Sequence, residues 1–163
     1  MNFKKVLCNG CFCLNLVSNT KRGIIEEMVD MLFKAGKLPD REAALHGVLE
    51  RERKMSTGMQ YGVAIPHGKT NTVDGLVTAF ALKKEGINFD ALDGQPSRIF
   101  IMTISSANRT GPHMQYLTEI SKVLNTPAIR ERLMNVQSVD EVIALLTDDE
   151  DDKAGEESDT GKG

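Results

Sequence analysis

Two early stretches of the chain carry apolar residues at helical spacing and predict amphipathic helices. Thr20 or Asn19 can cap the first helix, and Gly36 closes it. The second helix opens at Pro39-Asp40 and ends near Lys54. The inward positions are Ile24, Met28, Met31 or Leu32, and Ala35 in the first helix, and Ala44, Leu45, Val48 and Leu49 in the second.

Extended structure is predicted where apolar residues run together between turn signals. Ile99–Ile104 is nearly all apolar, which is typical of a central strand buried on both faces. Pro66-His67-Gly68 punctuates the end of another strand. The predicted extended segments are Val6–Val17 (one or two pieces around Asn9-Gly10), Tyr61–Ile65, Val73–Leu82, Ile87–Leu92 before an Asp93-Gly94 turn, and Ile99–Ile104.

The last part of the chain is helical in pattern. One helix starts at Gly111-Pro112, a short one runs from Pro127 to about Met134, and Ser138 with Glu141 forms a capping box for a third. The inward positions are His113, Leu117, Ile120 and Leu124, then Val139, Val142, Ile143 and Leu146. Because helices both precede and follow the strands, we expect an α/β fold, a three-layer αβα sandwich with a mixed sheet flanked by helices.

Charge is distributed unevenly along the 163 residues, whose formal net charge is −3. Residues 148–163 contain eight acidic residues, two lysines and no apolar residue larger than alanine, so we predict a disordered acidic tail. Residues 1–147 then hold 18 basic and 15 acidic residues and are expected to form one domain. This balance excludes a strongly basic nucleic-acid binder.

The amino end has the outline of a secretory signal, since two lysines precede an apolar run. Asn9, Gly10 and Asn15 interrupt that run, and no small-residue cleavage site follows. No stretch approaches the ~18 consecutive apolar residues of a membrane span. We therefore expect a cytoplasmic protein without membrane insertion.

Cys8, Cys11 and Cys13 are the chain's three cysteines, and three cysteines cannot all pair internally. A zinc site ordinarily takes four ligands, and the three histidines are distant in sequence. Reduced thiols in a strand are the plain interpretation, with a metal-binding or redox module as the alternative. No metal constellation is recognisable, and no cofactor is expected.

His67 is the sharpest chemical feature of the sequence. Pro66 fixes the backbone before it, and Gly68 removes side-chain bulk, so that another molecule could approach the imidazole. A neutral imidazole is a nucleophile near pH 7. A histidine at the end of a strand is, however, more often structural than functional.

The residues around His67 favour function. Gly62-Val63-Ala64-Ile65-Pro66-His67-Gly68 resembles the phosphorylation-site signature of type-2 enzyme IIA, the fructose/mannitol/nitrogen-regulatory class of the bacterial phosphoenolpyruvate-dependent phosphotransferase system. The resemblance covers roughly residues 18–147 and is closer to the nitrogen-regulatory and fructose branches. The cysteine-bearing amino end and the acidic tail depart from it. The further matching segments are Leu49-Glu50-Arg51-Glu52, Ser56-Thr57-Gly58, and Gly111-Pro112-His113-Met114 followed by Leu117 and Leu124.

The resemblance implies a role for three residues. His67 matches the histidine that accepts the phosphoryl group, Arg51 matches a nearby arginine, and His113 matches a second active-site histidine. Transfer between two histidines needs positioning and charge stabilisation rather than a general base. Arg51 would then stabilise charge, and His113 would orient or stabilise the phosphohistidine.

Each of these residues also has a structural interpretation. Arg51 can extend into solvent or pair with a carboxylate, and His113 can be a buried histidine that heads an apolar stripe. His46 has no site context and is expected to be structural or solvated. Residues predicted with less support to lie near the phosphate are Ser56, Thr57, Gly68 and Lys69, with Lys69 equally suited to a docking rim.

The leading hypothesis is a phosphocarrier that accepts a phosphoryl group on His67 from a histidine-containing phosphocarrier protein. It would act as a nitrogen-regulatory-type IIA protein whose phosphorylation state selects partners. The alternative is a soluble IIA subunit of a fructose/mannitol-type transport system that passes the group to a IIB cysteine. The chain carries no recognisable IIB domain and no membrane IIC segment, which favours the regulatory hypothesis modestly.

Overall fold

The computed structural model describes residues 2–108 and 110–147, and the predicted acidic tail lies outside them. The strands are β1 (Cys11–Cys13), β2 (Val63–Ala64), β3 (His67–Thr70), β4 (Leu76–Ile87) and β5 (Ser97–Ser106). The helices are α1 (Phe3–Cys8), α2 (Lys21–Lys34), α3 (Arg41–Lys54), α4 (Thr110–Leu124), α5 (Pro127–Leu133) and α6 (Val139–Thr147). No helix of the described residues is long and apolar enough to cross a membrane.

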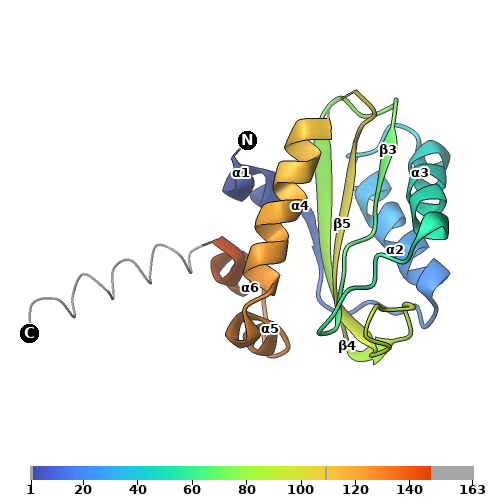
Figure 1. Ribbon diagram of the computed structural model, residues 1–163. Coiled ribbons are helices and arrows are strands. Elements are labelled where there is room, and N and C mark those ends of the chain that lie inside the picture. The colour runs from blue at the N-terminus through green and yellow to red at the C-terminus, as the bar shows by residue number, and fades with distance from the viewer. Residues whose placement is uncertain (1, 109, 148–163) are drawn as a thin grey trace, which may run out of the picture.

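The strands form one mixed sheet in the order β1-β4-β5-β2, with β3 also paired to β5. β4 and β5 are antiparallel, and the other pairings are parallel. Helices α2 and α3 cover one face, while α1, α4, α5 and α6 cover the other (Figure 1). The predicted three-layer αβα sandwich is confirmed.

β5 has the double burial that its apolar run predicts. Phe100, Met102 and Ile104 pack in the core beneath α2 and α3, whereas Ile99 and Ile101 pack beneath α4–α6. Successive side chains of a strand point to opposite faces, so a strand between two helical layers needs apolar residues at both parities. The central position of β5 is thus fixed by burial.

Most helix boundaries follow the predicted caps. The side chains of Thr20, Asp40 and Ser138 accept hydrogen bonds from the backbone N–H three residues further on, which confirms these three starts. Gly36 ends α2 with a φ of 76°, a conformation that glycine adopts without strain. Val139 is exposed instead of inward, so this part of the α6 prediction is wrong.

The amino end corrects the prediction of an extended Val6–Val17. Residues Phe3–Cys8 form α1, whose first turn is capped by the Asn2 side chain, and only Cys11–Cys13 form a strand. Leu7 is 1% exposed and packs in the core beneath α4–α6. A short apolar run can be buried as a helix or as a strand, and its periodicity does not decide between them.

Two further predicted strands differ from the observed ones. The strand expected over Tyr61–Ile65 pairs only at Val63–Ala64, and pairing resumes along β5 after Pro66, which has no N–H to donate. His67 therefore begins a strand rather than following one. The extended piece expected over Ile87–Leu92 is absent, because β4 itself continues to Ile87 and the chain then leaves the sheet.

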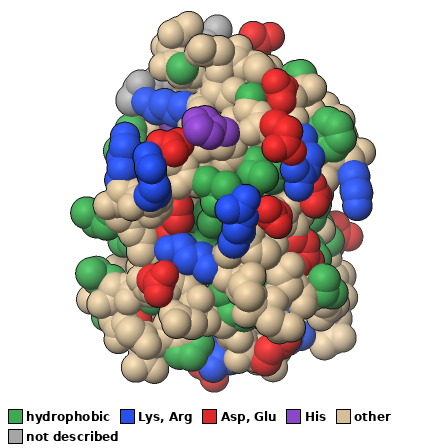
Figure 2. Space-filling view, turned by 90° about the vertical axis from the view of Figure 1, so that its right-hand side faces the viewer, with side chains coloured by type: hydrophobic (Ala, Val, Ile, Leu, Met, Phe, Trp, Pro, Cys, Tyr) green, Lys and Arg blue, Asp and Glu red, His purple; other side chains and the backbone are tan. Residues whose placement is uncertain are grey.

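Figure 2 shows the face formed by α2 and α3, where acidic and basic side chains are interspersed without a continuous basic patch. Beneath this face, α3 lies unusually close to β3. A Cβ on Gly68 would lie 2.6 Å from the backbone nitrogen of Val48, and one on Gly47 would lie 2.5 Å from the carbonyl oxygen of Lys69. The expectation that Gly68 leaves room for an approaching molecule is wrong, because α3 fills that space.

We predict that Gly68→Ala destabilises the protein by about 2 kcal/mol, since the added methyl group meets backbone rather than a flexible side chain. Urea unfolding measures this free energy. Gly75→Ala is the matched control, because nothing lies within 4 Å of its Cβ position, and its effect should stay below about 1 kcal/mol. Equal stability of the two variants would contradict the close contact between α3 and β3.

Candidate active site

His67 opens β3 at the edge of the sheet, opposite Thr103 of β5. Paired residues of neighbouring strands point to the same face, so its half-buried imidazole lies on the α4 side. Nδ1 of His67 lies 2.8 Å from the carbonyl oxygen of Ile65. A carbonyl can only accept a hydrogen bond, so Nδ1 carries the proton and Nε2 keeps its lone pair.

Burial is the main cause that lowers the pKa of His67 below its ordinary value of 6.5. The hydrogen bond to Ile65 opposes this shift, and among the neighbouring charges Arg51 and Lys69 lower the pKa while Glu52 raises it. The result is an imidazole that is neutral at pH 7. A neutral ring with a free Nε2 can act as a nucleophile.

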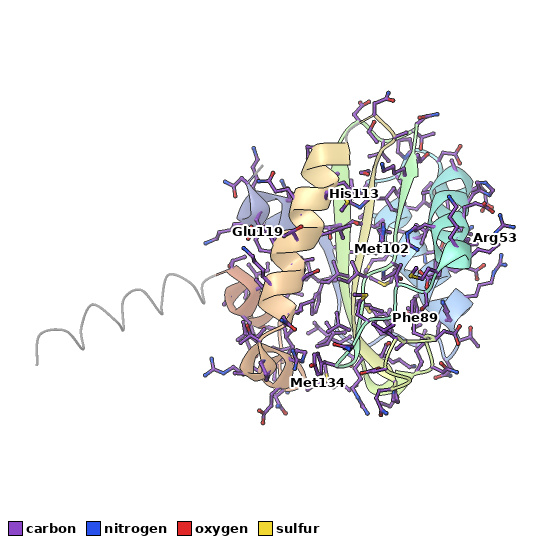
Figure 3. All side chains as sticks on the ribbon, in the orientation of Figure 1. Arg53, Phe89, Met102, His113, Glu119 and Met134 are labelled. Atoms are coloured by element: carbon purple, nitrogen blue, oxygen red, sulfur yellow. The ribbon has the colours of Figure 1, made fainter. Side chains whose placement is uncertain are left out.

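His113 is 2% exposed and points from α4 toward the sheet (Figure 3). Nε2 lies 2.8 Å from the hydroxyl of Thr103, and Nδ1 lies 2.6 Å from the hydroxyl of Ser105. The ring centroids of His113 and His67 are 5.5 Å apart, and the ring planes are nearly perpendicular. The two histidines predicted to share a site are therefore in edge contact.

Burial, followed by the charges of His67 and Lys69, lowers the pKa of His113 to about 4. The ring is neutral at pH 7, so one nitrogen donates and the other accepts. Both nitrogens are already engaged with hydroxyl groups of β5. His113 is thus held in one orientation beside His67, and neither of its nitrogens is available as a nucleophile.

Arg51 lies in the last turn of α3, and its Nη1 donates to the carbonyl oxygen of Met55. Its positive charge is close enough to lower the pKa of His67. Lys69 is exposed two residues after His67 on the same strand, and its charge acts on both histidines. The charges of two cations, Arg51 on α3 and Lys69 on β3, therefore act on the imidazole.

Three other positions predicted to lie near the phosphate, Ser56, Thr57 and Gly68, direct their side chains or Cα away from the His67 imidazole. Ser56 donates its hydroxyl to the carbonyl oxygen of Phe89, and Thr57 donates its hydroxyl to the buried carboxylate of Glu52. Gly68 faces α3. His46 is exposed on α3, in agreement with its predicted solvation. The outward Arg53 pairs with Glu50 at 2.8 Å (Figure 3).

A groove of about 560 Å³ lies between α4 and the segment that precedes β3. Ile65 and Met114, neighbours of His67 and His113, line one end of it. Met114 and Tyr61 are more than half exposed, and the guanidinium of Arg130 stacks on the Tyr61 ring at 4.5 Å. The groove is lined mainly by apolar side chains, and Lys122 is the charged residue among its lining residues.

Comparison with known proteins identifies the family. The sequence model described as "Phosphoenolpyruvate-dependent sugar phosphotransferase system, EIIA 2" matches residues 5–149. The chain belongs to this EIIA 2 family. The resemblance drawn from the residues around His67 is therefore confirmed, and proteins of this family are phosphotransferase components that pass phosphoryl groups.

Two curated EIIA relatives carry fructose-specific names. The PTS system fructose-specific EIIA component of Haloferax volcanii is 39% identical over 79% of this chain and 84% of its own length. The fructose-specific EIIABC component of Bacillus subtilis is 36% identical over 90% of this chain. The chain spans only 23% of that longer EIIABC protein.

Solved EIIA structures confirm the fold. Nitrogen regulatory protein IIA-Ntr from Neisseria meningitidis superposes with a TM-score of 0.80 at 31% identity, covering 88% of this chain and 98% of that one. Escherichia coli IIA mannitol, solved in complex with phosphorylated IIB mannitol, gives a TM-score of 0.72 at 27% identity, covering 83% of this chain and 92% of that one. Regulatory and sugar-specific members therefore share this architecture.

Sequence reasoning missed two residues that hold His113 in place and one buried carboxylate near the site. Thr103 and Ser105 bind the ring nitrogens of His113, and Glu52 is 7% exposed and bonded to Thr57. A signal for the hydroxyl pair was present, since Thr103 and Ser105 alternate on the same face as Ile99 and Ile101. Polar residues in such a buried strand require partners.

The cysteines lie away from this site, in and before β1. Cys8 is exposed, Cys11 and Cys13 are half-buried, and all three are free thiols. Burial raises the pKa of the Cys11 thiol, which reduces its thiolate content and its nucleophilicity. Within residues 2–108 and 110–147, no cluster of three histidine, cysteine or acidic residues could hold a metal ion.

We predict that His113 makes the protein acid-sensitive. A buried histidine with a pKa of about 4 binds a proton more weakly in the folded than in the unfolded chain, where the pKa is near 6.5. Its contribution to stability is full above pH 6.5 and falls as the pH drops toward 4, by about 3 kcal/mol. The measurement is urea unfolding of the wild type and His113→Gln at pH 7 and pH 4.

The free-energy difference between wild type and His113→Gln should shrink by about 3 kcal/mol between pH 7 and pH 4. Comparing the two proteins cancels the titration of carboxylates that they share. A difference that stays constant across this range would show that His113 is protonated as readily in the folded protein as in the unfolded one.

Proposed function

We propose that Nε2 of His67 accepts a phosphoryl group from a histidine-containing phosphocarrier protein, and that the protein acts as a nitrogen-regulatory-type IIA protein through phosphorylation-dependent partner binding. The observation that carries this proposal is the 2.8 Å contact between Nδ1 of His67 and the Ile65 carbonyl oxygen. It leaves Nε2 as the available nucleophile. The resemblance to the Neisseria IIA-Ntr structure supports the regulatory assignment.

The reaction is an exchange of one nitrogen–phosphorus bond for another. The Nε2 lone pair attacks phosphorus in line as the bond to the donor histidine breaks, and no hydroxyl proton has to be removed. The ring gains positive character when Nε2 bonds to phosphorus. The Ile65 carbonyl oxygen, already accepting from Nδ1–H, strengthens that hydrogen bond as the charge develops.

Arg51 and Lys69 serve in this proposal as the cations that stabilise the phosphoryl oxygens. Their charges already act on the His67 ring. His113 restricts the orientation of His67 through its edge contact, because both its nitrogens are held by hydroxyls. Phosphate contact is not assigned to Ser56, Thr57 or Gly68, whose side chains or neighbours are engaged elsewhere.

The surroundings of His67 suit a protein donor. Met59, Tyr61 and Met114 are exposed apolar side chains beside the groove, and Lys122 stands at its border. Apolar contact with a polar rim is the usual composition of a protein interface. We assign the docking of the phosphocarrier to this surface, and we assign residues 1–147 to one cytoplasmic IIA-like domain.

We predict that incubation with enzyme I, the phosphocarrier protein and phosphoenolpyruvate adds one acid-labile, alkali-stable phosphate, detected as a mass increase of the intact protein. His67→Ala should reduce the initial rate by at least ~1000-fold, because the neighbouring His113 is buried and both its ring nitrogens are bonded to hydroxyls. His46→Ala, an exposed histidine on α3, is the control and should react normally. Full-rate labelling of His67→Ala would refute the assignment.

Sugar transport is the second candidate, favoured by the 39% identity to the fructose-specific EIIA component of Haloferax volcanii. In that function the phosphoryl group would pass from His67 to a cysteine of a IIB protein. The two functions are separated by adding IIB proteins of the fructose and mannitol classes to the phosphorylated protein. The regulatory proposal predicts transfer slower than uncatalysed loss of phosphate, whereas rapid transfer to one of them would establish transport.

A further inference from the structure

Glu52 is a buried carboxylate that the phosphoryl-transfer scheme does not use. Only 7% of the residue is exposed, and its partners come from two directions. Oε1 accepts from the backbone N–H of Thr57 at 2.8 Å and pairs with Nζ of Lys21, also at 2.8 Å. Oε2 accepts from the Thr57 hydroxyl. A buried charge is retained at low cost only when it is satisfied in this way.

Thr57 in turn holds the backbone that leads to His67. The carbonyl oxygen of Thr57 accepts from the N–H of Ile65 at 3.0 Å, and the neighbouring Met59 N–H donates to Val63 at 2.7 Å. Segments 57–59 and 63–65 therefore lie antiparallel, with a bridge at Gly58 and Ala64. Ile65, whose N–H donates to the Thr57 carbonyl oxygen, is also the residue whose own carbonyl accepts from Nδ1 of His67.

We propose that Glu52 is a positioning residue: by fixing Thr57, it places the Ile65 carbonyl where it holds His67 in the Nδ1–H tautomer with Nε2 free. The consequence for phosphoryl transfer rests on the function proposed above, whereas the consequence for the tautomer does not. Arg51, adjacent on α3, bonds instead to Met55 and cannot perform this task. Glu52 thus acts on the His67 site indirectly, from a buried position and through Thr57.

Lys21 anchors this carboxylate from the first turn of α2. Its ammonium group also donates to the Ser56 hydroxyl at 3.3 Å, lies 3.5 Å from the Asp90 carboxylate and sits over the Phe89 ring. The Lys21 ammonium group on α2 therefore contacts Glu52 at the end of α3, Ser56 in the following loop, and Phe89 and Asp90 after β4. The Lys21 side chain is 22% exposed, and these contacts restrain its ammonium group beside Glu52.

The positional effect of Glu52 can be separated from the effect of its charge. The charged groups that act on His67 are Arg51 and Glu52 from α3 and Lys69 from β3, while the titratable His113 from α4 is neutral at pH 7. Among them the Glu52 carboxylate alone raises the pKa of His67. Glu52→Gln removes the charge but keeps an oxygen that can accept from the Thr57 N–H, whereas Glu52→Ala removes both.

The test measures the His67 tautomer in the intact protein from the ring nitrogen chemical shifts, using long-range proton–nitrogen correlation at neutral pH. The wild type should show Nδ1 protonated and Nε2 bare. Glu52→Ala should show a mixture of tautomers and a phosphorylation rate lowered by about tenfold or more, since the nucleophile is no longer oriented. Glu52→Gln should keep the wild-type tautomer and a rate within about threefold, with a lower His67 pKa.

Two further variants complete the test. Glu50→Gln, on the same helix but bonded to Arg53, is the matched control and should change neither tautomer nor rate. Thr57→Val keeps the shape of the side chain but removes its hydroxyl bond to Glu52, and should lower the rate by about threefold with a detectable second tautomer. If Glu52→Ala does not fold, the tautomer and rate of Thr57→Val test whether Glu52 positions His67.

A folded Glu52→Ala, or in its place Thr57→Val, with the wild-type tautomer and rate would overturn the inference. Failure of the proposed function has a different signature. If the wild type itself accepts no phosphate, the function is wrong, while the His67 tautomer in these variants still decides whether Glu52 positions the ring.

Discussion

The hydrogen bond from Nδ1 of His67 to the Ile65 carbonyl oxygen selects the ring nitrogen that faces the site, and the surrounding structure serves to keep it in place. The contact spans only two residues, so it depends on how the chain crosses Pro66. The backbone on either side is held: Val63–Ala64 and His67–Thr70 both pair with β5, and the Thr103 N–H donates to the Pro66 carbonyl oxygen. Strand pairing on both sides of Pro66 thus fixes the backbone that supports the hydrogen bond between His67 and Ile65.

The edge position of β3 explains how groups from both helical layers reach one imidazole. His113 reaches the ring from α4 on one face, and Arg51 approaches from the end of α3 on the other. The glycines at positions 47 and 68 bring α3 close enough to β3 for this to occur. A packed αβα interior would keep such groups apart, whereas the sheet edge lets them converge beside exposed surface.

Much of the architecture was predictable from local pattern, because amphipathic helices and a doubly buried strand leave strong signals. The starts of α2, α3 and α6 follow from Thr20, Asp40 and Ser138, and β5 follows from its apolar run. α1 was missed because six residues around Leu7 carry too little periodicity to separate helix from strand. The resumption of pairing at His67 is set by β5, which is distant in sequence.

The site was predictable in its residue types but not in its contacts. His67, Arg51 and His113 are predicted from the family resemblance; the rings of His67 and His113 are in contact, and the charge of Arg51 lowers the pKa of His67. That Ser56 and Thr57 turn their hydroxyls inward, and that Glu52 is buried, depends on Lys21 and Phe89 approaching from other parts of the chain. The directions of the Ser56, Thr57 and Glu52 side chains depend on contacts with distant parts of the chain, so the local sequence pattern does not predict them.

We propose that the fold leaves Nε2 of His67 as the phosphoryl acceptor. The most direct test is proton–nitrogen–phosphorus NMR of the phosphorylated protein, which identifies the bonded ring nitrogen from its chemical shift and its coupling to phosphorus. We expect phosphorus on Nε2 of His67, with Nδ1 protonated and hydrogen-bonded. Phosphorus on Nδ1 of His67, or on His113 or His46, would contradict it.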